Sequence, residues 1–231
     1  MKFAHSILLL ISLAGVASAA TIVQTGNFAF TPTGNQTLTF NEFDTTLGTL
    51  TSVTITTNLT KSGGSLFVDN DSGVAASGSI SQAVTINLTA TGANLINDSF
   101  SATIGSNVTS TSFYSASLAA DDGDGAGYQE GGADWAGTTF GDETVSQTES
   151  AGNITTYSDG GSGATFTIKV SGTQSTDTAA ISGVAGAFSP ATANGSVVVT
   201  YNYTAFAPVP EPASALLGGI GLLGLLRRRR R

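Results

Sequence analysis

The fold is decided by stretches such as LTSVTITTNLT, residues 50–60, in which apolar and polar side chains alternate. In an extended chain Val53, Ile55 and Leu59 fall on one face, and the threonine and asparagine residues between them fall on the other. Alternation with β-branched residues is typical of an antiparallel strand with one buried face and one face in water. We therefore expect a strand here whose apolar face lies in a core.

The same alternation recurs along the chain. Turns rich in glycine, asparagine and aspartate separate the alternating segments, and no segment of the body shows a convincing helical period. The pattern therefore predicts an all-β fold, a β-sandwich of jelly-roll or immunoglobulin-like type. The further strands that we expect are TIVQTGNFAF (21–30), QTLTF (36–40), AVTINLTA (83–90), ATFTIKV (164–170) and SVVVTYNYT (196–204).

The N-terminal residues have a different composition from this body. Residues 1–19 combine Lys2, an apolar run and small residues that include Ala17 and Ala19. This order predicts a secretory signal peptide that signal peptidase cleaves after Ala19. The β-sandwich body is then expected over residues 20–205.

Residues 206–231 form a second distinct segment. An apolar run of 14 residues over 213–226 is expected to form a single transmembrane helix. Such a helix would be about 21 Å long, shorter than a bilayer core of about 30 Å, so it suits a temporary anchor in the inner membrane. The basic tail after it is expected to stay in the cytoplasm by the positive-inside rule. The residues flanking the run are Val209, Pro210, Glu211 and Pro212 before it, and Arg227, Arg228, Arg229, Arg230 and Arg231 after it.

The Pro-Glu-Pro motif, the apolar run and the arginines, in this order at the C-terminus, resemble the PEP-CTERM sorting signal. This resemblance implies that an exosortase-type enzyme processes the chain at the motif after export through the inner membrane. The body is then expected at the cell surface or in the extracellular matrix.

A second resemblance concerns residues 40–57, FNEFDTTLGTLTSVTITT. Through Phe43, Asp44 and the stretch 47–50 they are similar to the opening of the choice-of-anchor E domain. That resemblance implies a β-rich secreted domain and no catalytic activity.

The body lacks the residue types that many active sites and metal sites need. The chain has no cysteine, and its one histidine, His5, lies in the predicted signal peptide. Disulfides, thiolate nucleophiles, Ser-His-Asp triads and the usual zinc or copper sites are therefore excluded from the body. Between residues 20 and 208 only Lys61 and Lys169 are basic, whereas all of the 16 acidic residues except Glu211 lie there. Such a surface is not expected to bind nucleic acid.

Two acidic turns, DNDSG (69–73) and DDGDG (121–125), are candidates for a calcium site. Closely spaced carboxylates present the oxygen ligands that calcium prefers. Aspartates also form hydrogen-bonded turns without a metal. We favour such turns over a calcium site here, and both interpretations remain open. No other cofactor is expected. The candidate ligands are Asp69, Asp71, Asp121, Asp122 and Asp124.

The acidic, glycine-rich region 119–163 also holds Tyr128 and Trp135, which are candidates for stacking against a sugar. A single tryptophan in a small β-domain is more often a core residue. Asp142 and Glu143 are adjacent, so in a strand they would point to opposite faces and could not act on one glycosidic bond. The chain is therefore expected not to be an enzyme.

These observations predict an exported, exosortase-sorted protein whose β-domain has a structural or adhesive role, associated with exopolysaccharide or biofilm. The alternative is a carbohydrate- or calcium-binding module that uses residues 119–163.

Overall fold

The computed structural model describes residues 18–31, 33–91, 108–151, 153–158 and 163–207, with the isolated positions 218, 219, 221, 222 and 227. The sorting motif, residues 1–17 of the signal peptide and most of the predicted transmembrane run therefore lie outside the described residues. Among the residues that the structure does describe, no helix combines the length and the apolarity needed to cross a membrane.

The first layer of the body is a four-stranded sheet in the order β1-β11-β3-β8. Its members are β1 (Ala19–Phe30), β11 (Thr192–Ala205), β3 (Gly48–Ser62) and β8 (Glu143–Ser150). All neighbours in this sheet are antiparallel. β1 pairs with β11 along its full length, from Ala19 opposite Thr204 to Phe30 opposite Ala193.

The second layer is a four-stranded antiparallel sheet in the order β2-β9-β5-β6. Its members are β2 (Asn35–Asn41), β9 (Thr165–Asp177), β5 (Ala76–Thr91) and β6 (Val108–Leu118). The described body is thus all-β, apart from the single 3-10 turn η1 (Ile154–Tyr157), and is consistent with the predicted β-sandwich. Its jelly-roll or immunoglobulin-like type stays a prediction.

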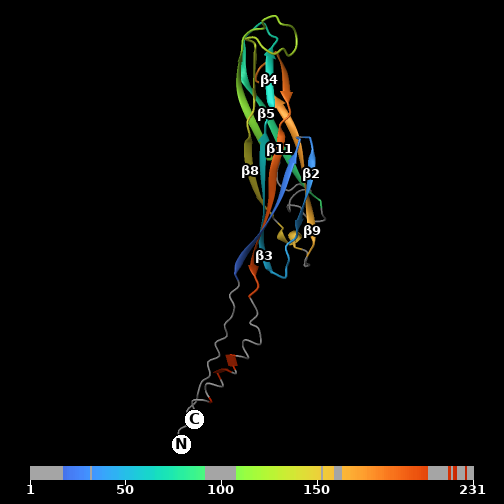
Figure 1. Ribbon diagram of the computed structural model, residues 1–231, viewed down its shortest axis with the longest axis vertical. Coiled ribbons are helices and arrows are strands. Elements are labelled where there is room, and N and C mark those ends of the chain that lie inside the picture. Colours follow the sequence, from blue (N-terminus) through green and yellow to red (C-terminus); the bar gives the residue numbers. More distant parts are fainter. Residues whose placement is uncertain are drawn as a thin grey trace.

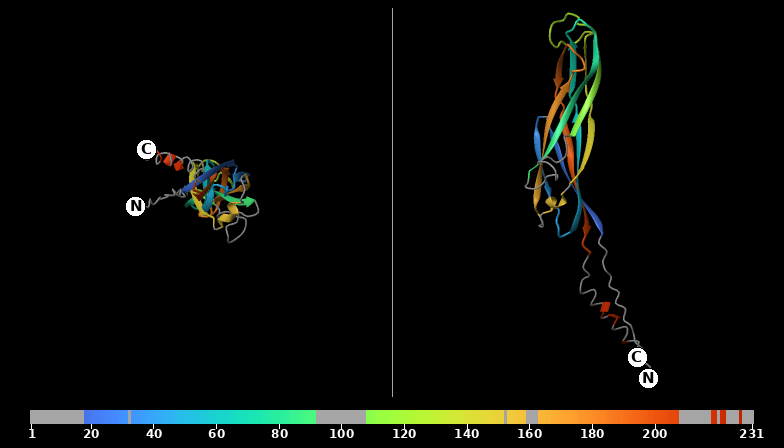
Figure 2. Two further views of the ribbon diagram at one scale, coloured as in Figure 1. Left: turned by 90° about the horizontal axis from the view of Figure 1, so that it is seen from below. Right: turned by 180° about the vertical axis from the view of Figure 1, so that it is seen from behind.

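A third, three-stranded sheet extends the first layer. It contains β10 (Val184–Ser189), β4 (Ser65–Asn70) and β7 (Trp135–Thr139) in the order β10-β4-β7. Two or three residues connect each of these strands to a strand of the first sheet: β3 leads to β4, β7 to β8 and β10 to β11. The three connections interrupt the ladder of strand hydrogen bonds, and at Gly63 and Gly64 the backbone takes positive φ and turns locally. We call this interrupted region the bend. The body as a whole is long and narrow (Figures 1 and 2).

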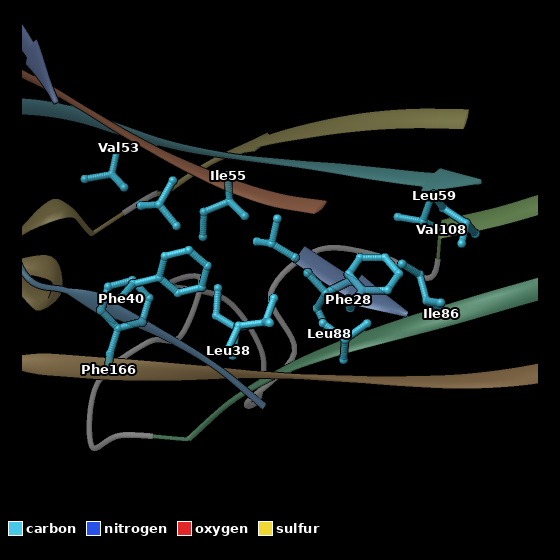
Figure 3. Close-up of a cluster of buried hydrophobic side chains, with 14 of the residues drawn as sticks. Phe28, Leu38, Phe40, Val53, Ile55, Leu59, Ile86, Leu88, Val108 and Phe166 are labelled. Carbon is cyan, nitrogen blue, oxygen red and sulfur yellow. The ribbon is translucent and has the colours of Figure 1, made fainter. Parts of the chain in front are cut away.

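Two apolar clusters fill the sandwich on either side of this bend. The larger lies between the two four-stranded sheets, where side chains from both layers point toward one another (Figure 3). The smaller packs beneath the three-stranded sheet and includes Leu66, Val68 and Ile80. The predicted inward positions Val53, Ile55 and Leu59 are confirmed, since all three are buried. Alternating apolar residues of the other expected strands are buried as well: Val84, Ile86, Leu88, Phe166, Ile168, Val170, Val197, Val199 and Tyr201.

Polar side chains separate the two clusters at the bend. The amide nitrogen of Gln82, a fully buried residue, donates hydrogen bonds to the carbonyl oxygens of Ser189 at 2.9 Å and Ser65 at 3.4 Å. The Nζ of Lys61, also fully buried, donates to Gly63 O at 3.0 Å. Because buried backbone groups must find partners where a strand is interrupted, these side chains replace the missing ladder bonds.

The chain enters and leaves the body at the same end. Ala205 N donates to Ser18 O at 2.8 Å, beside the first pair of β1 and β11. We call this end the base; the loop of residues 119–134 lies at the other, the distal end (Figure 1). β3 and β4 follow each other along the long axis, and at about 3.3 Å per residue they span roughly 70 Å.

Candidate functional site

The loop between β6 and β7 folds over the distal end of β4. Ala119 N donates to Ala133 O at 2.9 Å and closes the loop at its neck. The Nδ2 of Asn70, which is fully buried, donates to Ala119 O, and Asn70 N donates to Asp134 O at 3.0 Å. A single buried asparagine at the end of β4 therefore holds both ends of the loop.

The two acidic turns that the sequence predicted separately meet in this loop. Asp69 Oδ2 accepts a hydrogen bond from Gln129 N at 2.7 Å, and Asp71 accepts one from Gly127 N at 3.2 Å. Asp121 N donates to Ser72 O at 2.9 Å. Asp69 and Asp71 therefore accept hydrogen bonds from the backbone of the 119–134 loop, and the two acidic turns form one acidic region.

The other predicted carboxylates converge with one that the sequence did not single out. Asp121, Asp122, Asp124 and Asp134 each offer a carboxylate oxygen, and these oxygens all lie within 4.8 Å of one another. We call these four residues the carboxylate cluster. Asp121 also forms the turn that the alternative interpretation expected, since its Oδ1 accepts a hydrogen bond from Gly123 N at 2.8 Å.

Asp134 is the buried member of the carboxylate cluster. It is 1% exposed, and its Oδ2 accepts a hydrogen bond from Asp122 N at 2.9 Å. Its Oδ1 is also buried and has no hydrogen-bond partner among the described residues. A methyl group built onto Gly132 would lie 2.5 Å from Asp122 Oδ2 and 2.6 Å from Asp134 Oδ1, so both oxygens border the same small space.

The electrostatics of this end are strongly negative. Loss of hydration raises the pKa of the Asp124 carboxyl above its ordinary value, and the charges of Asp122 and Asp69 raise it further. The two basic side chains of the body are engaged elsewhere: Lys61 at the bend, and Lys169 on β9, opposite Thr37 of β2. The described part of the body therefore brings no cationic side chain to the carboxylate cluster.

Asp134 was missed because nothing near it in sequence resembles a calcium loop. It stands alone in GGADW, between two glycines and the tryptophan that begins β7. Two features could have indicated Asp134 as a ligand: it lies one residue before a strand, and the sequence just before it is rich in carboxylates. Its burial depends on Asn70 and β4, more than 60 positions earlier, and local sequence does not reveal such a contact.

Tyr128 and Trp135 lie together, as their proximity in the sequence suggested. The indole Nε1–H of Trp135 donates a hydrogen bond to the Tyr128 hydroxyl at 3.1 Å. The Phe67 ring stacks on Trp135 with centroids 5.4 Å apart and planes at 12°. Trp135 is half-buried. One face of the indole is thus covered by protein, and a sugar contact at Trp135 stays a prediction.

Asp142 and Glu143 lie at the bend, away from the carboxylate cluster. Burial lowers the pKa of the Lys61 ammonium, and the negative charges of Glu143 and Asp142 partly oppose this shift. The Lys61 Nζ also lies 4.7 Å from the centroid of the Phe140 ring. The acidic pair therefore offsets part of the unfavourable burial of one lysine.

Residues 208–231 match the PEP-CTERM protein-sorting motif. This match confirms the predicted sorting signal, and it implies export, membrane-anchored sorting at the C-terminus and processing by an exosortase. It includes Val209 to Pro212 and the five terminal arginines, whose individual roles stay predictions. The resemblance of residues 40–57 to the choice-of-anchor E domain also stays a prediction, as does cleavage after Ala19.

No curated protein matches the chain. A chain in the structure of the infectious bursal disease virus Gt strain is 12% identical with a TM-score of 0.14; the match covers 87% of this chain and 50% of the viral one. A chain in the crystal structure of the T13 IBDV viral particle is 13% identical with a TM-score of 0.16, at 79% and 36% coverage. This chain thus spans about half or less of the viral chains, and neither likeness bears on its fold or function.

Proposed function

We propose that this chain is a surface or extracellular-matrix protein whose β-sandwich is a non-catalytic structural or adhesive module, held upright during sorting. The sorting motif supports export and a membrane-anchored stage. One observation carries the orientation: β1 begins beside the end of β11, so both targeting segments join the module at its base. The acidic distal end then faces away from the membrane while the tail anchors the chain.

The side chains at the base are compatible with a position close to lipid. Leu47 is 43% exposed and Phe206 is 60% exposed, and Phe206 N donates to Leu47 O at 3.2 Å. Large aromatic and apolar side chains are tolerated at a membrane interface. The carboxylate cluster, which anionic lipid would repel, lies at the opposite end.

The outer faces of the sandwich suit a hydrated polysaccharide matrix. Threonine hydroxyls bond across neighbouring strands, at 2.8 Å between Thr56 and Thr148 and at 2.8 Å between Thr85 and Thr109. Such rows leave hydroxyl groups along both sheets, and hydroxyl groups exchange hydrogen bonds with water and with sugars. The absence of cysteine and of a body histidine from the sequence supports a role without catalysis.

Sorting is tested by following the mass and location of the chain in cells. Deleting the exosortase, or replacing Pro210, Glu211 and Pro212 together by alanine, should retain the full-length chain in the inner membrane. Glu130→Ala, which removes an exposed acidic residue far from the motif, should leave sorting unchanged. Release of a chain of unchanged mass from cells without the exosortase would contradict the proposal.

Carbohydrate binding through Tyr128 and Trp135 is a second candidate function. The observation that favours it is the fixed orientation of the half-buried indole, which stacks on Phe67 and bonds to Tyr128. Trp135→Ala should then release the chain from the polysaccharide of its host, whereas Phe113→Ala, at an exposed aromatic position on β6, should not. Equal retention of both variants would rule this function out.

A further inference from the structure

The buried carboxylate of Asp134 is incompletely paired. Its Oδ2 has a backbone donor, but its Oδ1 has no partner in the described structure and borders the space that it shares with Asp122 Oδ2. A buried oxygen that carries negative charge is strongly unfavourable unless a donor or a cation faces it. The orientation of this oxygen therefore indicates a missing positive partner.

No side chain of the described body supplies that partner. Three further carboxylates surround the same space, and Lys61 makes its hydrogen bonds at the bend. Asp69, also 1% exposed, adds a second buried carboxylate, whose Oδ1 has no hydrogen-bond partner among the residues that the structure describes. Hydrogen bonds from backbone N–H groups at Gln129 and Asp122 do not neutralise so many charges, whereas one divalent cation would remove most of the repulsion.

The chemistry of the ligands narrows the choice of cation. All the side-chain ligands are carboxylates, and the exported body has neither histidine nor cysteine, so zinc and copper are disfavoured. Oxygens on opposite sides of a calcium ion lie about 4.6 to 5.2 Å apart, and those on opposite sides of magnesium about 4.0 to 4.2 Å. Cluster oxygens that all lie within 4.8 Å of one another fit around either ion. Magnesium usually keeps several waters and binds through one or two carboxylates, whereas calcium takes six to eight oxygen ligands, so a set of four carboxylates favours calcium.

We propose that the distal end of the sandwich is a calcium site, with Asp121, Asp122, Asp124 and Asp134 as ligands. Asp134 is the buried ligand at the end of the 119–134 loop, directly before β7, and the other three ligands come from the beginning of the same loop. Asp69 and Asp71 position that loop through Gln129 and Gly127. Calcium binding therefore fixes the loop to the three-stranded sheet and stiffens the end of the module that points away from the membrane.

The test uses the full chain in mild detergent, with calcium chloride as the titrant in calorimetry and with thermal unfolding in calcium or in chelator. At 100 times its Kd, calcium should raise the Tm of the wild type by about 5 to 10 °C. Asp134→Asn keeps the shape of the side chain and its bond from Asp122 N but loses the charge. This variant should bind calcium at least tenfold more weakly, and in chelator it should unfold no earlier than the wild type.

Glu130→Gln is the matched control, since it removes one exposed charge from the same loop but none from the carboxylate cluster. It should keep the calcium affinity and the Tm shift of the wild type. Asp124→Asn, at an exposed ligand position, should lose affinity as Asp134→Asn does, so the test holds even if the buried variant misfolds. The proposal is overturned if calcium leaves the wild-type Tm unchanged, if both ligand variants respond like the wild type, or if magnesium stabilises the chain as strongly.

Discussion

Gly64 offers a sharp test of the bend that joins the two halves of the sandwich. Its φ is +84°, and a Cβ at this position would overlap Gln82 Oε1 and lie 3.0 Å from the Cβ of Ala191. Gln82 cannot retreat without losing its 2.9 Å bond to Ser189 O. In Gly64→Ala the left-handed backbone should therefore cost about 1 to 2 kcal/mol, and the disrupted buried hydrogen bond about 1 to 3 kcal/mol more.

The sum of about 2 to 5 kcal/mol corresponds to a Tm lower by about 4 to 20 °C for a domain of this size, measurable by circular dichroism on the full chain in detergent. Gly63 is the matched control, because its φ is also positive, at +66°, but a Cβ there would meet nothing within 4 Å. Gly63→Ala should show only the backbone effect. Adding Gln82→Ala to Gly64→Ala should cost less than the two single changes together. Equal losses in the two glycine variants would refute the role of Gln82.

Further predictions concern the larger core and two buried tyrosines. Phe40→Ala removes a buried ring that stacks on Phe166 with centroids 5.5 Å apart, and it should lower the free energy of unfolding in urea by about 3 to 5 kcal/mol. Phe113→Ala, at a position that is 71% exposed, should change this free energy by less than about 0.5 kcal/mol. Similar losses in the two variants would contradict the assignment of Phe40 to the core. Tyr201→Phe removes the hydroxyl that donates to Asn41 O at 2.9 Å and should cost about 0.5 to 1.5 kcal/mol in the same assay, and an unchanged stability would dispute that bond. Burial raises the pKa of Tyr157 to about 12, so between pH 10 and 12 the unfolded chain releases a proton that the folded chain keeps. The free energy of unfolding should therefore fall as the pH rises from 10 to 12, and it should fall less in Tyr157→Phe than in the wild type. If the two proteins lose the same free energy over this range, Tyr157 is not responsible for the loss.

The long strands could be predicted because each has one face in the core and one in water. β3, β5, β9 and β11 therefore carry an alternation that is visible without any partner. The sequences of β7 (WAGTT) and β10 (VAGAFS) carry no such pattern. These segments are strands because each pairs with β4, one on either side of it. Where pairing rather than composition determines a strand, local sequence is a weak guide.

One residue at the bend breaks the alternation of the sequence, and only the structure explains why. Lys61 stands two residues after Leu59, so the alternation of β3 places its charge on the core face. A lysine there contradicts the expected apolar pattern until the interrupted backbone at Gly63 is known.

At the distal end the types of residues were predictable but their meeting was not. Both acidic turns were visible as candidate calcium ligands. The bond from Gly127 N to Asp71 joins residues 56 positions apart and forms because the loop after β6 folds over the end of β4. Asp134 enters the cluster for the same reason, since Asn70 of β4 fixes the end of the loop on which it stands.

The central claim is that the base faces the membrane during sorting and the acidic end faces away from it. The chain has no cysteine, so Leu47→Cys at the base and Glu130→Cys at the distal end can each be labelled with one dye. In cells without the exosortase, energy transfer from the dye to an acceptor in the lipid should be strong from position 47 and weak from position 130. Transfer that is equal from both positions, or stronger from position 130, would contradict the account.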